Sequence, residues 1–193
     1  PAEVSWEQAG GLDIVGRTAW ASVEAIALTP ADTVLVSAAA GGVGVIAAQL
    51  AKLKGATVIG SASESNHEFL RSLGIHPVAY GEGMVERILE ISPEGVTAAL
   101  DNNGRETVDA ALALGAPADR INTIADYAAV SEYGTSGVGA AGATSDDLAS
   151  LSALVAAGTV QVPIDSVFPF EQVSQAYTQL LDGHSRGKIV LAL

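Results

Sequence analysis

The segment Val34-Leu35-Val36-Ser37-Ala38-Ala39-Ala40-Gly41-Gly42-Val43-Gly44 decides the fold. It begins with an apolar run of the kind that is buried on both faces of a parallel sheet. Small residues and glycines follow, and a helix is predicted from about residue 42 to 54, because apolar side chains recur there at helical spacing. A buried strand that passes through a glycine-rich turn directly into a helix is the setting of a dinucleotide-binding fingerprint.

The glycines of this turn have a predicted chemical role. Gly41 and Gly42 would let a pyrophosphate approach the backbone, and Gly44 would let the helix lie close on the strand. N–H groups at the start of the helix would then bind the anion with the help of the helix dipole. The fingerprint G-x-G-x-x-G is incomplete, because Ala39 occupies its first position. Glycines that serve packing alone are the alternative, and the βα units that follow favour nucleotide binding.

The rest of the chain alternates β-rich runs with helical patterns, which is typical of parallel βαβ units. We therefore predict an α/β fold: a doubly wound Rossmann domain over residues 30–160, with a parallel sheet of order 3-2-1-4-5-6. Residues 1–29 would form two helical pieces joined at Gly10-Gly11, and residues 161–193 a strand-helix-strand return segment. Further strands are predicted at 56–60, 77–80, 96–100, 120–123, 136–140 and 188–193, and helices at 64–73, 84–90, 106–114, 146–157 and 171–181.

Composition excludes several classes of protein. Nine basic and 22 acidic side chains give the 193 residues a net charge of −13, which disfavours binding to nucleic acid. Without cysteine there is no thiolate nucleophile and no zinc–thiolate site, and the histidines at 67, 76 and 184 lack metal-binding spacing, so we expect no metal. Ser37, glycines and Gln49 interrupt the apolar stretch 34–51, so we expect no membrane span and a cytoplasmic protein.

The end of the second predicted strand bears on the choice of dinucleotide. NAD-selective folds place an acidic residue there to bind the ribose hydroxyls. This sequence has Gly60-Ser61-Ala62-Ser63 and no carboxylate before Glu64. Because hydroxyl groups accept a 2′-phosphate without repulsion, the sequence favours NADP(H). Helix capping is the alternative role of Ser61 and Ser63. The nearest candidates for further phosphate ligands are Asn66, His67 and Arg71.

Three other motifs are excluded by spacing. No tyrosine is followed four residues later by lysine, which excludes a short-chain dehydrogenase. No Gly-x-Ser-x-Gly occurs, which excludes the nucleophile elbow of an α/β-hydrolase. The run Gly183-His184-Ser185-Arg186-Gly187-Lys188 is one residue short of a phosphate-binding loop and precedes a strand instead of following one. We predict a turn there.

Several motifs in this order resemble the medium-chain dehydrogenase/reductase superfamily, and most closely its zinc-free quinone oxidoreductase and enoyl reductase branch. Besides the glycine-rich turn, they are Thr18-Ala19-Trp20, Ala48-Gln49-Leu50-Ala51-Lys52, Ala56-Thr57-Val58-Ile59-Gly60, Phe69-Leu70-Arg71-Ser72-Leu73-Gly74 and Arg186-Gly187-Lys188-Ile189-Val190-Leu191. The resemblance covers nearly the whole chain. It implies an NADPH-dependent reductase that transfers a hydride to quinones or α,β-unsaturated carbonyls.

The resemblance also implies positions for the cofactor. The implied contacts are Ala40, Gly41, Gly42 and Val43 for the pyrophosphate; Ser61, Ser63 and Tyr80 for the 2′-phosphate; Asn102, Thr123 and Ile124 for the nicotinamide ribose; Thr18 for the nicotinamide end; and Lys188 as a further contact. Each has a structural alternative: Tyr80 as a packed aromatic at the sheet edge, Asn102 as a turn residue, and Lys188 as a solvated strand end. No catalytic residue is identified.

Two departures from the family pattern affect the prediction. A GroES-like substrate domain normally precedes this region and is absent here, so residues 1–29 would be its linking helices and residues 161–193 would return toward it. Such a part alone is expected to be inactive. Relatives usually carry Asp-x-x-Gly-Gly where this chain has Asp101-Asn102-Asn103-Gly104, so the nicotinamide loop would differ in shape.

Two other functions stay open alongside the reductase. One is a non-catalytic, redox-sensing NADP(H)-binding module, and the other is an enoyl reductase module of a larger synthase. The family pairs its sixth strands edge to edge, so the resemblance implies a homodimer through Ser136–Ala140.

Overall fold

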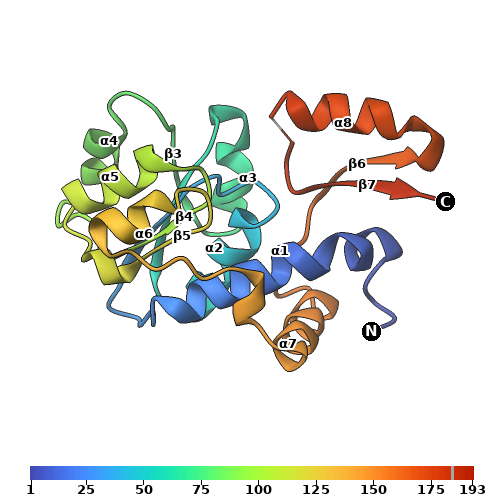
Figure 1. The fold of residues 1–193 in the computed structure, drawn as a ribbon, viewed down its shortest axis with the longest axis horizontal. Coiled ribbons are helices and arrows are strands. Elements are labelled where there is room, and N and C mark those ends of the chain that lie inside the picture. The colour runs from blue at the N-terminus through green and yellow to red at the C-terminus, as the bar shows by residue number, and fades with distance from the viewer. Residues whose placement is uncertain (184) are drawn as a thin grey trace.

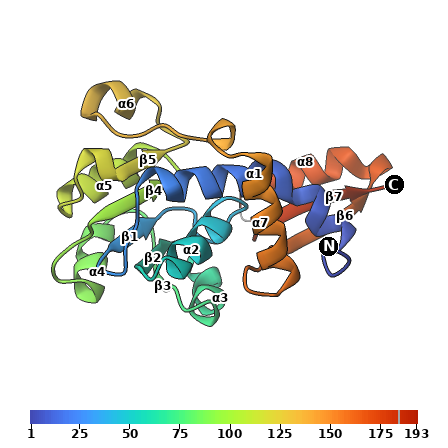
Figure 2. The ribbon, with the colours of Figure 1, turned by 90° about the horizontal axis from the view of Figure 1, so that it is seen from below.

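The computed structural model, which describes residues 1–183 and 185–193, contains a five-stranded parallel sheet of order β3-β2-β1-β4-β5 (Figures 1 and 2). The strand order confirms the predicted doubly wound arrangement for these five strands. His184, one of the three histidines whose spacing argued against a metal site and part of the predicted turn at 183–188, lies outside the described residues. The strands are β1 (Thr33–Val36), β2 (Thr57–Ser61), β3 (His76–Val78), β4 (Ala98–Asp101) and β5 (Ile121–Thr123).

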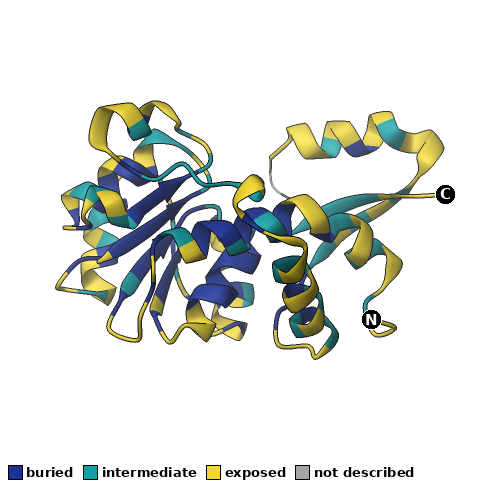
Figure 3. Cartoon of the chain, turned by 60° about the horizontal axis from the view of Figure 1, so that its bottom comes forward, coloured by how far each residue is buried: buried dark blue, intermediate teal, exposed yellow. Residues whose placement is uncertain are grey.

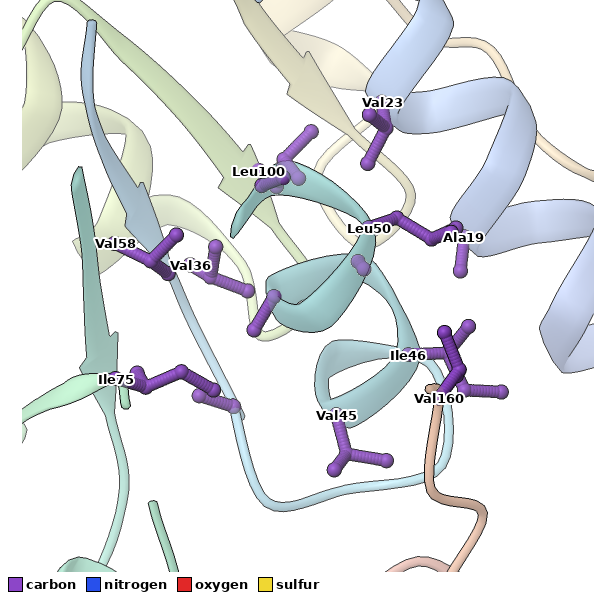
Figure 4. Packing of buried hydrophobic residues seen from close by; sticks show 14 of the residues in the cluster. Ala19, Val23, Val36, Val45, Ile46, Leu50, Val58, Ile75, Leu100 and Val160 are labelled. Atoms are coloured by element: carbon purple, nitrogen blue, oxygen red, sulfur yellow. The ribbon is translucent and has the colours of Figure 1, made fainter. Parts of the chain in front are cut away.

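The sheet separates two hydrophobic cores. Val34 and Val36 of β1 belong to one core and Leu35 to the other, because successive side chains of a strand point to opposite faces. Figure 4 shows α2 lying between strand residues of the first core and Ala19 and Val23 of α1. The first core is covered by α1 (Trp6–Ala25), α2 (Gly44–Leu53), α3 (His67–Ser72) and α7 (Ser145–Ala156), and the second by α4 (Met84–Ile91), α5 (Arg105–Ala113) and α6 (Ala128–Tyr133).

The N-terminal region is one helix, so the predicted break at Gly10-Gly11 is wrong. A capping box starts α1: Gln8 N–H donates to Ser5 Oγ and Ser5 N–H donates to Gln8 Oε1, each over 3.2 Å. A glycine inside a helix costs about 1 kcal/mol relative to alanine. Packing offsets this cost at Gly11, where a Cβ would lie 3.3 Å from Cγ of Lys188. The absence of a side chain thus leaves room for the lysine.

The predicted sixth strand is also wrong. Residues 136–140 make a single bridge to β5, between Ser136 and Asn122, and then enter the short 3₁₀ helix η3 (Ala140–Gly142). The Asn122 side chain takes over the role of the strand backbone: its Oδ1 accepts from Val138 N–H (2.8 Å) and its Nδ2 donates to Val138 O (3.0 Å). Gly137 and Gly139 add no side chains that could pack on the sheet, which explains why a regular strand does not continue.

The C-terminal residues form a separate strand-helix-strand unit, as predicted. It consists of β6 (Ile164–Pro169), the 3₁₀ turn η4 (Phe170–Gln172), α8 (Val173–Leu181) and β7 (Lys188–Ala192), and β6 pairs with β7 in parallel. Figure 3 shows that this unit is mostly exposed or half-buried, in contrast to the sheet region. In α8 only Ala176 is buried, while Tyr177 and Leu180 are exposed. Two short 3₁₀ helices, η1 (Glu64–Asn66) and η2 (Ala118–Arg120), complete the described elements.

Candidate functional site

The turn between β1 and α2 has the backbone form of a dinucleotide-binding turn. Ala38 adopts φ +46°, a left-handed conformation that costs an alanine roughly 1 kcal/mol and is often retained at functional sites. The N–H of Gly41 donates to Ala38 O over 2.8 Å and closes the turn. A Cβ on Gly44 would overlap with the carbonyl of Ala38, so α2 could not lie this close to the turn with any other residue there. Gly44 therefore has the packing role expected of it.

The amide groups at the start of α2 are available to a ligand. Among the described residues, no acceptor takes a hydrogen bond from the N–H groups of Gly42, Val43 or Gly44. These amides lie at the N-terminal end of α2, with Gly44 as its first residue and Val43 as its N-cap, and the helix dipole adds positive potential there. An anionic group such as a diphosphate would be stabilised there by backbone donors, even though the chain as a whole is strongly acidic.

A cleft of about 260 Å³ opens beside this turn. It runs from the end of β2 across the end of β1 toward the loop after β4, that is, across the point where the strand order reverses. Ligands of open α/β sheets bind at that point, outside the carboxyl ends of the strands. Five of the predicted cofactor residues line the cleft together: Ala40, Gly41, Ser61, Ser63 and Tyr80. The other lining residues are Ala38, Ala62, Asn66, Asn103, Gly183 and Ser185.

Polar side chains gather at the β2 end of the cleft. Ser61 is buried, and its hydroxyl makes no hydrogen bond within the described part of the chain. Ser63 Oγ accepts from Asn66 Nδ2 over 3.1 Å and lies 3.1 Å from Ser65 Oγ. Ser63 makes no capping bond to the helix that follows, which weakens the alternative role considered for it.

Tyr80, which is half exposed, faces this end of the cleft from the loop after β3. Arg87 of α4 holds that loop in place. Its Nε and Nη2 donate to Ala79 O over 3.2 and 2.8 Å, and its Nη1 donates to Glu82 O over 3.0 Å. Tyr80 is thus not packed into the sheet edge.

A buried carboxylate organises the opposite end of the site. Asp101 Oδ1 accepts from Ser37 Oγ (3.2 Å) and from the N–H groups of Asn103 (2.9 Å) and Gly104 (2.7 Å), and Oδ2 accepts from Thr123 Oγ1 (2.6 Å). These bonds join the carboxyl ends of β1, β4 and β5. The sequence pattern did not identify this role of Asp101, although a carboxylate at the end of a buried strand is a signal that could have drawn attention to it.

The three residues predicted to lie at the nicotinamide ribose are all part of this network. Asn102 N–H donates to Ser37 Oγ and its Nδ2 donates to Ser37 O, each over 2.8 Å. Thr123 is fully buried, and Ile124 N–H donates to Asp101 O over 2.9 Å. They lie together at the carboxyl ends of neighbouring strands, outside the residues that line the cleft. Their contact with a cofactor stays a prediction.

Thr18 and Lys188 also lie outside the lining of the cleft. The hydroxyl of Thr18 donates to Ile14 O within α1 over 2.6 Å. The alkyl chain of Lys188 packs between Gly11 and Gly42: a Cβ on Gly42 would be 3.0 Å from Lys188 Cδ, with Val15 Cγ1 at 3.5 Å. Gly42 therefore leaves room for the C-terminal segment, whereas its neighbour Gly41 lines the cleft.

The C-terminal segment is joined to the glycine-rich turn itself. Gly187 N–H donates to Ala40 O over 2.8 Å, in a parallel bridge between Gly41 and Gly187. This bridge brings Gly183, Ser185 and Arg186 to the cleft or to its rim. They are more than 120 residues distant in sequence from the second strand, and no spacing rule connects the two segments.

An ionic cluster holds α6 against α5 beyond the Asp101 network. Arg105 donates to Asp126 (2.5 Å) and pairs with Glu132 (2.8 Å), and its guanidinium lies 5.0 Å from the ring centre of Tyr133. The hydrogen bond with Glu132 is the main cause that raises the pKa of Arg105, and the same bond lowers the pKa of Glu132. The cluster is on the surface and has a structural role.

The described residues offer no zinc site. The sequence contains no cysteine, and no group of three His, Asp or Glu side chains lies within metal-binding reach of one another in residues 1–183 and 185–193. In the same residues, every helix is too short or too polar to cross a bilayer.

Comparison with known proteins gives a consistent result. Residues 73–191 match the family model described as zinc-binding dehydrogenase. The bovine mitochondrial NAD(P)H oxidoreductase RTN4IP1 is 29% identical over 228 residues, which cover 99% of this chain and 57% of the relative. The polyketide synthase GfsB of Streptomyces halstedii is 40% identical over 115 residues, which cover 59% of this chain and 2% of that protein.

A solved structure shows the same fold over the whole chain. The quinone oxidoreductase of Coxiella burnetii superposes with a TM-score of 0.88 at 29% identity, covering 100% of this chain and 62% of the other. This chain therefore spans about three fifths of the length of that oxidoreductase and of RTN4IP1, and a small part of the synthase.

Proposed function

The chain belongs to the zinc-binding dehydrogenase family, within the medium-chain dehydrogenase/reductase superfamily, and from this premise we propose that it is the NADP(H)-binding part of a reductase acting on quinones or α,β-unsaturated carbonyls. One observation carries the proposal: three unpaired amides at the start of α2 adjoin a cleft that crosses the reversal point of the sheet. When bound there, the reduced nicotinamide would supply the hydride.

The chain's own residues would bind and orient this cofactor. The amides of Gly42, Val43 and Gly44 would hold the diphosphate, and Ser61, Ser63 and Tyr80 would hold the adenosine end. Asn102, Thr123 and Ile124 would position the nicotinamide ribose, with their own geometry fixed by Asp101 and Ser37. The support is that these groups lie in this order across the sheet, at the carboxyl ends of β2, β1, β4 and β5.

The substrate half would be formed with a further domain. The exposed apolar side chains of the C-terminal unit, among them Tyr177, Leu180 and Leu181, favour this arrangement, since a two-stranded sheet with so little buried surface is not stable by itself. The relatives are also longer than this chain. We propose that residues 161–193 pack against a GroES-like substrate domain and that residues 1–29 link to it.

Nucleotide titration followed by turnover tests the proposal. We expect saturable binding of NADPH, followed by fluorescence of the reduced nicotinamide, and oxidation of bound NADPH by the full-length protein when a quinone or an enone is added. A protein that binds NADPH but turns over neither substrate class would be the redox-sensing module instead. Absence of saturable binding to either NADPH or NADH would contradict both functions.

An enoyl reductase module of a larger synthase is a second candidate, and the similarity to the polyketide synthase GfsB favours it. The two enzymatic functions differ in their acceptor. An enoyl reductase module would reduce an α,β-unsaturated thioester in preference to a quinone, so the ratio of kcat/KM for these two acceptors distinguishes them.

We also propose that the protein forms a two-fold dimer through the edge segment 136–140. Ser136 exchanges backbone hydrogen bonds with β5, and the backbone of Val138 bonds to the side chain of Asn122, so the segment follows the free edge of β5. Val138→Pro removes the N–H that orders this edge, while Val138→Ala keeps it. Sedimentation should show a dimer for the wild type and Val138→Ala, and a monomer for Val138→Pro. A monomeric wild type, or a dimeric proline variant, would refute edge pairing.

A further inference from the structure

The nine basic side chains of the protein differ in whether they pair with a carboxylate, donate to a backbone carbonyl group or have donors free for a ligand. Three lie in ion pairs with carboxylates: Lys54 with Glu24, Arg105 with Asp126 and Glu132, and Arg120 with Asp32. Arg17, Lys52 and Arg87 have backbone carbonyl groups as their only side-chain acceptors in the described residues. Lys188 is packed along the glycines of α1 and of the turn. Arg71 and Arg186 are left as cations that could act on a ligand at the β2 end of the cleft.

Arg186 is held at the rim of the cleft in a fixed orientation. Its Nε donates to Asn66 Oδ1 over 2.8 Å, and its Nη2 donates to Ser65 O over a longer 3.4 Å. The guanidinium carbon lies 4.8 Å from the ring centre of Phe69, which supports one face of the group. Asn66 in turn donates to Ser63 Oγ, and both residues line the cleft.

The guanidinium of Arg186 has N–H donors that make no hydrogen bond within the described residues. Of its five N–H groups, the two hydrogen bonds above use two, and Nη1 donates to no described residue. The carboxylate of Asp165 accepts from the Arg186 backbone N–H and from Gln179, and no carboxylate of the described residues forms an ion pair with the guanidinium. Arg186 therefore presents an uncompensated positive charge beside Ser63 and Ser65.

We propose that Arg186 is the residue that makes this site prefer NADP(H) to NAD(H), by binding the adenosine 2′-phosphate together with Ser63. The inference rests on the proposed function. It assigns the charge to the C-terminal segment rather than to α3, where Arg71 is exposed in the last turn of the helix, away from the residues at its start that line the cleft. The bridge between Gly41 and Gly187 is then what places Arg186 correctly.

The test measures affinities for NADPH and NADH, and for the fragments adenosine 2′,5′-bisphosphate and 5′-AMP, in Arg186→Gln and Arg71→Gln. A hydrogen bond to a charged group contributes strongly to binding. Arg186→Gln should therefore lower the affinities for NADPH and for the bisphosphate by roughly 10- to 100-fold. NADH and 5′-AMP should bind within about twofold of the wild type, because neither carries the 2′-phosphate. Arg71→Gln should leave all four affinities unchanged, and Arg186→Lys should restore part of the preference.

Each other result has a defined meaning. If Arg186→Gln weakened NADPH and NADH equally, Arg186 would support the fold of the site and the proposal would fail. The proposal would also fail if Arg186→Gln left the NADPH affinity unchanged, or if Arg71→Gln caused the larger loss of NADPH affinity. If the wild type bound neither NADPH nor NADH, the proposed function itself would be wrong, and this result is obtained with the wild type alone, before any variant is made.

Discussion

Replacing Gly41 by aspartate should abolish NADP(H) binding while the protein remains folded. Gly41 lines the cleft, and a Cβ at this position would have only Ala38 within 4 Å, with Ala38 O at 3.2 Å. A side chain there would extend into the space where the diphosphate is expected. A carboxylate would also repel it, and close like charges cost several kcal/mol. We expect NADPH affinity to fall at least roughly 100-fold.

Gly10→Asp is the matched control for this variant. It adds the same negative charge in the exposed part of α1, where a Cβ would have no neighbour within 4 Å. Affinity is measured by fluorescence titration, and folding is monitored by circular dichroism and by the thermal midpoint. If Gly41→Asp bound NADPH as tightly as Gly10→Asp, the diphosphate would not lie on this turn, and the assignment of the cleft would be wrong.

Gly42 shows why the choice of glycine matters. From the sequence, Gly41 and Gly42 have the same predicted role. In the structure, the open side of Gly42 faces Lys188 and Val15, so a side chain there would displace the C-terminal segment. A loss of affinity in a Gly42 variant would therefore combine two effects, whereas Gly41 reports on the cleft alone.

The five-strand order and the positions of most helices could be predicted, because they follow from local patterns. Apolar runs such as Val34–Val36, followed by amphipathic segments and glycine stops, determine where βα units begin and end. The observed bounds differ from the predicted ones by one or two residues in most elements. Helix α6 was not predicted, since its six residues give too short a pattern to recognise.

The errors arose where tertiary contacts override local signals. Gly10-Gly11 is typical of a helix break, yet Lys188 fills the space beside Gly11 and the helix continues. The run 136–140 looks like a weak strand, yet the side chain of Asn122 replaces the ladder that a strand would make. In both cases the deciding partner lies on another element.

Only part of the candidate site could be predicted, because some of its residues follow predicted strands while others reach it through tertiary contacts. Ser61 and Ser63 directly follow a predicted strand, so their place at the cleft could be inferred from the pattern of the fold. Arg186 reaches the same cleft only through the pairing of Gly187 with the turn, which no sequence spacing encodes. Asp101 likewise acquires its role from three neighbouring strands at once.

The end of the sheet opposite the cleft contains a buried acid, Asp32, on which a large part of the stability should depend. Its Oδ2 accepts from the N–H (2.7 Å) and hydroxyl (2.8 Å) of Thr29, and its Oδ1 accepts from Thr97 Oγ1 (2.6 Å). Arg120 Nη2 lies 2.9 Å from Oδ1 as an ion pair, at an angle that does not make a good hydrogen bond. Together these contacts join the start of β1 to the starts of β4 and β5.

These contacts make the stability depend on pH in a defined direction. Burial by itself would raise the pKa of Asp32, but the hydrogen bonds from Thr97 and Thr29 and the close contact with the Arg120 guanidinium outweigh it and lower the pKa to about 2, from 3.8 in an unperturbed aspartate. A carboxyl whose pKa is lower in the folded state stabilises that state fully above its unfolded pKa. The stabilisation, about 2 kcal/mol, is lost as the pH falls from about 4 toward 2.

Asp32→Asn should therefore lower the free energy of unfolding at pH 7 by about 2–4 kcal/mol, because the variant also leaves Arg120 without its partner. Asp119→Asn, at an exposed neighbouring position whose side chain makes no hydrogen bond or ion pair with the described residues, is the control and should change it by less than about 0.5 kcal/mol. In denaturant titrations, the deficit of Asp32→Asn should shrink toward pH 2, where the wild-type carboxyl becomes protonated as well. A deficit that stayed constant with pH would mean that the shape of the side chain, and not its charge, determines the loss of stability.

Since Asp32 lies at the opposite end of the strands from the cleft, NADPH affinity of the folded variant at pH 7 should stay within about twofold of the wild type. Stability and cofactor binding would then be shown to depend on different ends of the same sheet.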